Sequence, residues 1–155
     1  MGATPLPLLA ILVLALTSHA SASKCRSPCH WPDDPDTLCY GLFANIFYGK
    51  VERVYKKSDL SYVDYSVEIL KIYRSENSRY VHDNAVVTLR TTLHTKICPI
   101  KKMFKGETHY FAVGQLGRAS DNYRIKADSC DSYIRRHLRH GVRVDLESGK
   151  FNTPC

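Results

Sequence analysis

The sequence predicts a mostly-β domain in which five strands form a small closed or partly open barrel, with a helix near the C-terminus. Three observations support this fold class. Segments rich in β-branched and aromatic residues are separated by short polar turns. The clearest segment, residues 61–73 (SYVDYSVEILKIY), alternates apolar and polar residues with period two. Six cysteines follow an apolar leader, which indicates disulfides that reinforce the fold.

The leader is expected to be a cleaved secretion signal. Its apolar run from Leu6 to Leu16 is shorter than the about 20 residues that a bilayer span needs. Small residues follow the run and provide several cleavage contexts of the A-x-A type. We therefore expect a signal peptide over residues 1–23, cleaved between 20 and 24, and one exported domain over residues 24–155.

The first half of the domain begins with a loop and continues with two strands. Residues 24–38 contain three prolines, which remove backbone donors and oppose helix, so we expect a stiff tethered loop. Residues 40–55 are rich in β-branched and aromatic residues, which favours a strand. After a polar turn, residues 61–73 are expected to form a strand with one dry face and one wet face.

The second half is expected to hold three more strands and the helix. These strands are predicted over residues 85–93, 108–116 and 123–127, with turns at residues 101–106 and 117–122. Residues 131–140 (DSYIRRHLRH) space their apolar side chains loosely as in a helix, and Gly141 is a stop signal for it. Five antiparallel strands with one wet face are typical of a small barrel.

The cysteines could hold a metal, form a redox pair, or form disulfides. A structural zinc site needs closely spaced ligand pairs in both halves, but Cys98, Cys130 and Cys155 are single and widely spaced. A redox pair needs C-x-x-C at a helix N-terminus, which the spacing of Cys25 and Cys29 does not provide. Three disulfides are therefore expected, and the sequence alone does not choose among their fifteen pairings.

Several segments are similar, in their order and spacing, to one known family. They are the cysteines Cys25, Cys29 and Cys39, the strand YSVEILKIYRS, the isolated KICP around Cys98, the strand FKGETHYFAVGQL, and the ending DSCDSYI followed by Cys155. Over nearly the whole mature chain they resemble the netrin-like module, most closely the N-terminal domain of the tissue inhibitors of metalloproteinases. The resemblance implies a five-stranded OB-type barrel. It also implies the disulfides Cys25–Cys98, Cys29–Cys130 and Cys39–Cys155. Each would close a loop of about 70 to about 115 residues, worth about 4 to 5 kcal/mol in the chain-entropy model.

The resemblance further implies inhibition of extracellular metalloproteinases. In the family the mature chain begins at its first cysteine, whose α-amine and carbonyl oxygen chelate the catalytic zinc of the protease. Cys25 would be that zinc ligand only if it were the mature N-terminus, because an acylated nitrogen is a poor ligand. Here Lys24 precedes Cys25, and three residues separate the first two cysteines where the family usually has one. The implied protease contacts are Cys25, Arg26, Ser27, Pro28, Cys98 and Pro99.

The net charge of +7 favours a second hypothesis, that of an extracellular-matrix module without inhibitory activity. Outside the cell, such a charge indicates anionic partners such as sulfated glycans or acidic matrix proteins. On the expected helix, Arg135 and Arg139 would share a face. The glycan-binding candidates are Lys101, Lys102, Lys105, Arg135, Arg136, Arg139 and Arg143.

Other classes of function are not expected. The sequence has no nucleophile elbow, H-E-x-x-H or phosphate loop, so we expect neither an enzyme nor a cofactor. OB-type barrels often bind single-stranded nucleic acid, but secretion argues against that ligand. The mature protein is expected to be a monomer without a membrane span, secreted to the extracellular space or matrix.

Overall fold

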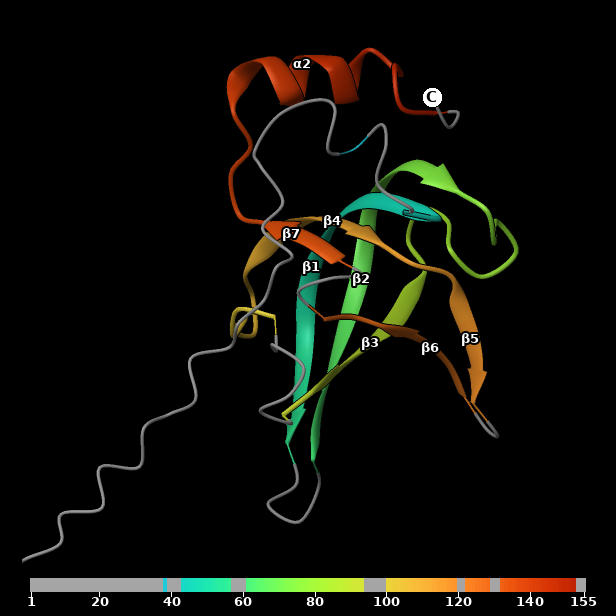
Figure 1. The fold of residues 1–155 in the computed structure, drawn as a ribbon, viewed down its shortest axis with the longest axis vertical. Coiled ribbons are helices and arrows are strands. Elements are labelled where there is room, and N and C mark those ends of the chain that lie inside the picture. The colour runs from blue at the N-terminus through green and yellow to red at the C-terminus, as the bar shows by residue number, and fades with distance from the viewer. Residues whose placement is uncertain are drawn as a thin grey trace, which may run out of the picture.

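Seven strands form one mixed sheet that curls into a half-barrel, and one helix near the C-terminus packs on one side of it (Figure 1). The computed structural model describes residue 38 and residues 43–56, 61–93, 100–119, 122–128 and 132–152. The predicted mostly-β chain with a C-terminal helix is confirmed. The elements are β1 (Asn45–Lys56), β2 (Tyr62–Ser75), β3 (Val86–Thr92), β4 (Thr108–Val113), β5 (Leu116–Ala119), β6 (Asn122–Lys126), β7 (Ser132–Arg135) and α2 (His140–Glu147).

The strand order explains why the sheet curls. The order is β5-β6-β3-β2-β1-β4-β7, and every neighbouring pair is antiparallel except β3 and β6, which are parallel. β4 and β5 lie near opposite ends of this order, yet only Gly114 and Gln115 separate them in the chain. The sheet must therefore bend until these two regions meet.

The long β1–β2 hairpin at the centre of the sheet bends at irregularities in its register. Three register shifts occur along β1, one of them between Tyr48 and Gly49. Bulges of this kind increase the local twist of a strand. A Cβ atom on Gly49 would lie 2.8 Å from the carbonyl oxygen of Glu68, so only glycine lets the two strands approach this closely.

The inner face of the curled sheet holds the larger of two apolar cores. Four alternate residues of β2 are buried in it, which confirms the dry face predicted from the period-two pattern. They are Val63, Tyr65, Val67 and Ile69. Phe47 of β1 and Phe111 of β4 stack in the same core with their ring centroids 5.0 Å apart. Burial of each such side chain contributes about 1.5 to 3 kcal/mol.

The smaller core lies on the outer face of the sheet, beneath α2. Val142 and Leu146, one helical turn apart, are both buried in it. The helix is also tied to β2 through Glu147, which accepts a hydrogen bond of 2.8 Å from the hydroxyl of Tyr73 and forms an ion pair with Lys71. The sheet therefore has apolar cores on both faces, one inside the curl and one under the helix.

The number of strands differs from the prediction of five antiparallel strands. The predicted fourth strand, residues 108–116, is divided at Gly114 and Gln115, so that β4 pairs with β1 whereas β5 pairs with β6. The chain reverses within the predicted turn at residues 117–122, but the turn was predicted too long, because residues 117–119 belong to β5 and residue 122 to β6. Because of this break, consecutive parts of the chain pair with β1 and with β6, which are far apart in the strand order of the curled sheet.

The helix predicted over residues 131–140 is also wrong. Residues 132–135 form β7, which pairs with β4 as an edge strand. Tyr133 packs in the smaller core, and the next residue, Ile134, packs against the larger one. Neighbouring side chains thus face opposite sides of the sheet, which is the geometry of a strand.

The observed helix begins where the predicted helix was expected to end. α2 starts at His140, so Gly141 lies in its first turn and is no stop signal. The glycine that follows the helix is Gly149, whose φ of 82° is the left-handed conformation common after a helix C-terminus.

Several features predicted from the sequence lie outside the described residues. These are the signal peptide, most of the leader loop, and all six cysteines with the three implied disulfides. Leu38 is the described exception, and its side chain is buried in the smaller core. The predicted leader loop over residues 24–38 therefore has at least one contact with the folded domain, made by its last residue.

Candidate functional site

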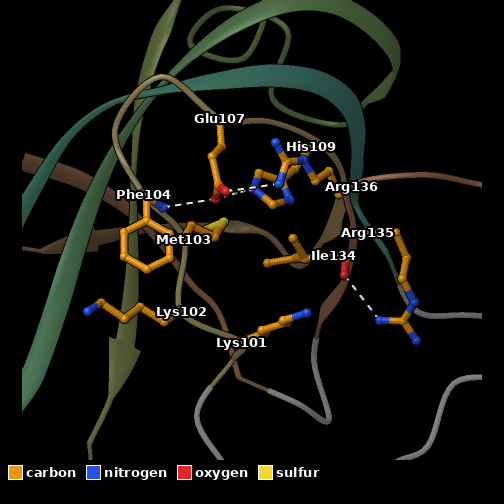
Figure 2. A pocket seen from close by; sticks show the side chains of 9 residues that line it. All are labelled: Lys101, Lys102, Met103, Phe104, Glu107, His109, Ile134, Arg135 and Arg136. Carbon is orange, nitrogen blue, oxygen red and sulfur yellow. Dashed lines mark hydrogen bonds and ion pairs between the residues drawn. The ribbon is translucent and has the colours of Figure 1, made fainter.

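A cavity of about 540 Å³ opens beside the start of β4, and positively charged side chains surround it (Figure 2). We call it the basic pocket. Its described lining residues are Lys101, Lys102, Met103, Phe104, Glu107, His109, Ile134, Arg135 and Arg136. They come from the loop before β4, from β4 itself, and from β7 with the residue that follows it.

Backbone hydrogen bonds hold the loop before β4 against β1. The amide of Gly106 donates to the carbonyl of Val51 at 2.7 Å, and the amide of Val51 donates to the carbonyl of Glu107 at 2.9 Å. Gly106 has a φ of 87°, which a residue with a side chain rarely adopts, so the loop turns sharply there. Met103 is only 1% exposed and forms part of the apolar floor of the pocket with Ile134 (Figure 2).

Glu107 is the only carboxylate among the described lining residues of the basic pocket, and it is surrounded by donors. One oxygen accepts the backbone N–H of Phe104 at 3.0 Å and lies 3.3 Å from Nε2 of His109. The other oxygen accepts Nη1 of Arg136 at 3.2 Å. These contacts, led by the backbone hydrogen bond, lower the pKa of Glu107, so it stays ionised and neutralises part of the charge of Arg136.

His109 lies deeper in the pocket and is 8% exposed. Its ring packs edge-on against Phe111, with the centroids 5.9 Å apart. Burial lowers the pKa of His109, and the nearby charges of Arg136 and Lys101 lower it further, whereas Glu107 opposes the shift. The imidazole is therefore mainly neutral at neutral pH.

Two of the four cations that line the basic pocket lie over aromatic rings. Nζ of Lys102 lies 4.8 Å from the ring centroid of Phe104, and the guanidinium of Arg135 lies 4.5 Å from that of Tyr133. With one partly neutralised carboxylate against four cations, the described lining has a net positive charge. Such a site suits an anion, and guanidinium groups suit sulfate or phosphate oxygens in particular.

A second cavity, of about 360 Å³, lies on the other face of β4. We call it the tyrosine cleft. Its described lining residues are Tyr48, Thr108, Tyr110, Arg136, His137, Leu138 and Arg143. Tyr48 and Tyr110 are cross-strand partners of β1 and β4, and their ring centroids are 4.8 Å apart.

The two cavities meet at Arg136. His109 of β4 lines the basic pocket, whereas its neighbours Thr108 and Tyr110 line the tyrosine cleft, because successive side chains of a strand point to opposite faces. Arg136 follows the last residue of β7 and lines both cavities. The guanidinium of Arg136 therefore contributes positive charge to both cavities, which lie on opposite faces of β4.

The structure brings most of the predicted glycan-binding residues into these cavities. Lys101, Lys102, Arg135 and Arg136 line the basic pocket, and Arg143 joins Arg136 at the tyrosine cleft. Lys105 and Arg139 are not among the described lining residues of either one. The expectation that Arg135 and Arg139 share a helix face is wrong, because Arg135 ends β7 and Arg139 precedes α2.

The sequence interpretation missed the residues that give the cavities their shape. Glu107 and His109 lie two residues apart and line the same pocket, which the period-two pattern could have shown only if the predicted strand had begun one residue earlier, at 107. The pairing of Tyr48 with Tyr110 needs the register of β1 and β4, which the sequence does not contain. The protease-contact candidates Cys25, Arg26, Ser27, Pro28, Cys98 and Pro99 lie outside the described residues.

The described residues show neither a metal site nor a membrane-spanning helix. They contain no group of three His, Cys, Asp or Glu side chains placed to hold a metal ion. None of their helices combines the length and the apolar character that crossing a membrane requires.

Comparison with models of known protein families gave no match to this chain, and a search of the curated proteins gave none either. The candidate site is therefore defined by its own chemistry: a basic pocket and a tyrosine cleft that share Arg136.

Proposed function

We propose that this chain is a secreted extracellular module that binds sulfated glycans through the basic pocket. The observation that supports this most is that Lys101, Lys102, Arg135 and Arg136 line one cavity, although they come from two segments more than 30 residues apart. Solvated lysines and arginines need not share a cavity in this way.

The chemistry of the pocket fits a sulfated sugar better than a bare inorganic anion. The cations form the rim and can pair with sulfate groups, while Met103 and Ile134 offer apolar surface to the less polar face of a sugar ring. Phe104 is 55% exposed beside this floor and adds an aromatic surface. A polyanion gains affinity mainly by releasing counterions, so binding should weaken steeply as salt rises.

Heparin affinity chromatography and calorimetry at several salt concentrations test this proposal. The double variant K101Q/K102Q should elute at lower salt than the unchanged protein, and the slope of log affinity against log salt should fall by about one to two. The matched control K56Q/R79Q removes the same charge from two exposed residues that line neither cavity, Lys56 at the end of β1 and Arg79 in the turn after β2. Lys56 is six residues along β1 from Lys50, about 20 Å from the start of β4, with which Lys50 pairs.

The control separates a site from a general effect of charge. The control variant should elute close to the unchanged protein. Equal shifts in both double variants would mean that net charge alone retains the protein on heparin, and the proposed site would be rejected. Lack of salt-sensitive binding by the unchanged protein would reject glycan binding altogether.

We propose inhibition of extracellular metalloproteinases as a second function, carried by the N-terminal cysteine segment. The strand order favours it, because β4 and β5 taken as one bent strand leave five strands, β1, β2, β3, β4–β5 and β6, with β7 added at the edge. This order, with β3 parallel to the last strand, suits the OB-type barrel that the resemblance to tissue inhibitors of metalloproteinases implies. Fold-level similarity is a weaker argument than a site.

The inhibitory chemistry depends on the mature N-terminus. A free α-amine and the carbonyl of Cys25 would take the open positions of the protease zinc that water otherwise occupies. N-terminal sequencing of the secreted protein and an assay against a panel of matrix metalloproteinases test this directly. A mature start at Cys25 together with inhibition supports the proposal, and inhibition that survives an added N-terminal alanine excludes chelation by the amine. The two functions use different segments and can coexist.

A further inference from the structure

The tyrosine cleft has a different composition from the basic pocket. Tyr48 and Tyr110 place two aromatic rings side by side, and Thr108 adds a hydroxyl. Sugar rings pack their C–H faces against aromatic rings, and their hydroxyl groups bond to polar side chains such as tyrosine and threonine. The cleft therefore offers an aromatic surface with polar groups at its border, which suits a sugar ring.

The cleft is also positively charged. Arg136, His137 and Arg143 line it, and its described lining contains no carboxylate. Two described acids lie near it: Glu107 pairs with Arg136, and Glu147 pairs with Lys71 and accepts the hydroxyl of Tyr73, contacts that lower the pKa of Glu147. Arg143 lies close enough to lower the pKa of Glu147 further but forms no ion pair with a described residue. Its guanidinium is exposed and can meet an anion.

Arg136 is the one described residue that lines both cavities. Its guanidinium pairs with Glu107 at the basic pocket and also lines the tyrosine cleft. A single small anion would fill only one cavity. A linear polymer with a charge on each repeating unit can occupy one cavity and continue over Arg136 into the other.

We propose that one sulfated glycan chain occupies both cavities, with a sulfated sugar ring against Tyr48 and Tyr110 and its sulfate near Arg143. This inference rests on the proposed glycan binding at the basic pocket and extends it to the tyrosine cleft. Binding both cavities with one chain raises affinity through effective concentration, because the second contact becomes intramolecular. The affinity of the protein should therefore depend on the length of the glycan chain that it binds.

Heparin oligosaccharides of defined length, from disaccharide to decasaccharide, test this by titration calorimetry with the full mature protein. Affinity should rise by about tenfold or more at the length that first reaches both cavities. R143Q should remove most of that rise and leave the affinity for the shortest binding oligosaccharide nearly unchanged. The matched control R79Q changes an exposed arginine in the turn after β2 and should behave as the unchanged protein.

A second pair of variants tests the aromatic surface separately from the charge. Y110F keeps the ring and should retain the rise with length, whereas Y110S removes the ring and should lose it. Thermal unfolding of both variants checks that Y110S still folds. If Y110S does not fold, the effect of R143Q on the rise in affinity with length tests the proposal alone.

The failure of this inference differs from the failure of glycan binding. If short oligosaccharides bind and K101Q/K102Q abolishes that binding, but affinity does not rise with length, the inference is overturned while the basic pocket stands. A rise with length that R143Q leaves intact also overturns it. If no oligosaccharide binds the unchanged protein, both proposals are rejected.

Discussion

Nη1 of Arg136 lies 3.2 Å from Oε1 of Glu107, and this ion pair joins the segment after β7 to the loop before β4. Both residues line the basic pocket, where Figure 2 shows them beside His109, and Arg136 also lines the tyrosine cleft. The stronger this ion pair is, the less strongly the guanidinium of Arg136 attracts an anionic ligand. Glu107 therefore limits the affinity of the pocket for anions while holding the pocket together.

E107Q should increase the affinity for heparin. The glutamine oxygen can still accept the N–H of Phe104, but the negative charge is lost, so Arg136 becomes fully available. We expect elution from heparin at higher salt and a salt slope that is steeper by up to about one. The control E76Q removes an exposed carboxylate in the turn after β2. Weaker binding by E107Q than by E76Q would contradict this role.

The stability of the protein should fall as pH decreases below about 6.5, in part because of His109. Burial lowers the pKa of His109 below the model-peptide value of 6.5, which the unfolded chain retains. The unfolded state therefore binds more protons between pH 6.5 and the lowered pKa, and the free energy of unfolding decreases across that window. Above pH 6.5 both states are neutral and the contribution is constant.

H109Q isolates this contribution. Urea denaturation at pH 7.5 and at pH 5.5 gives the change in the free energy of unfolding for each protein. The change should be smaller for H109Q than for the unchanged protein. An equal change in both proteins would show that groups other than His109 account for the whole effect between pH 7.5 and pH 5.5.

G49A should destabilise the fold. The added Cβ would lie 2.8 Å from the carbonyl oxygen of Glu68 and 2.8 Å from a methyl group of Val67. β1 and β2 would have to separate at the centre of the sheet, with a cost of about 1 to 3 kcal/mol. Chemical denaturation measures this loss. An unchanged midpoint would show that the hairpin is more loosely paired than its register indicates.

G141A should have the opposite effect. Gly141 lies in the first turn of α2, and no atom within 4 Å would meet an added Cβ. Alanine is favoured over glycine in a helix by up to about 1 kcal/mol, so we expect a small gain in the free energy of unfolding. A clear loss of stability would instead agree with a helix that ends at Gly141.

Peptide mapping of the native protein without reduction should find three long-range disulfides. The resemblance implies Cys25–Cys98, Cys29–Cys130 and Cys39–Cys155, which would connect the proline-rich leader to later parts of the domain. Reduction should then lower stability by up to about 4 to 5 kcal/mol for each bond. Free thiols, or bridges confined to the first forty residues, would contradict both this pairing and the netrin-like proposal.

The strands that have one dry face were predictable from the sequence. Residues 61–73 predicted β2, which runs over Tyr62–Ser75, because the buried residues there lie on a single face. The alternation weakens towards the end of β2, where Tyr73 and Arg74 are both buried. The smaller core beneath α2 covers the outer face of the sheet at that point. Side chains on both faces are therefore buried there, and apolar residues no longer fall on every second position.

The C-terminal part was not predictable, for a related reason. Tyr133 and Ile134 are adjacent and both apolar because β7 has a core on each face, and two neighbouring apolar residues fit a helix as well as a strand. The basic pocket was predicted only as a set of charges. Its shape depends on the pairing of β4 with β7, which brings the residues around 101–107 to those around 134–136.

The two ends of the sheet also bear on self-association. The strand order ends in β5 on one side and β7 on the other, and each has only four residues. Very short edge strands present few unpaired backbone groups, which is how many β proteins avoid adding strands from a second molecule. If the protein gathers on a polyanionic matrix, as the proposed glycan binding implies, its copies will lie close together. The short edge strands then offer few backbone groups to which a strand of a second molecule could add.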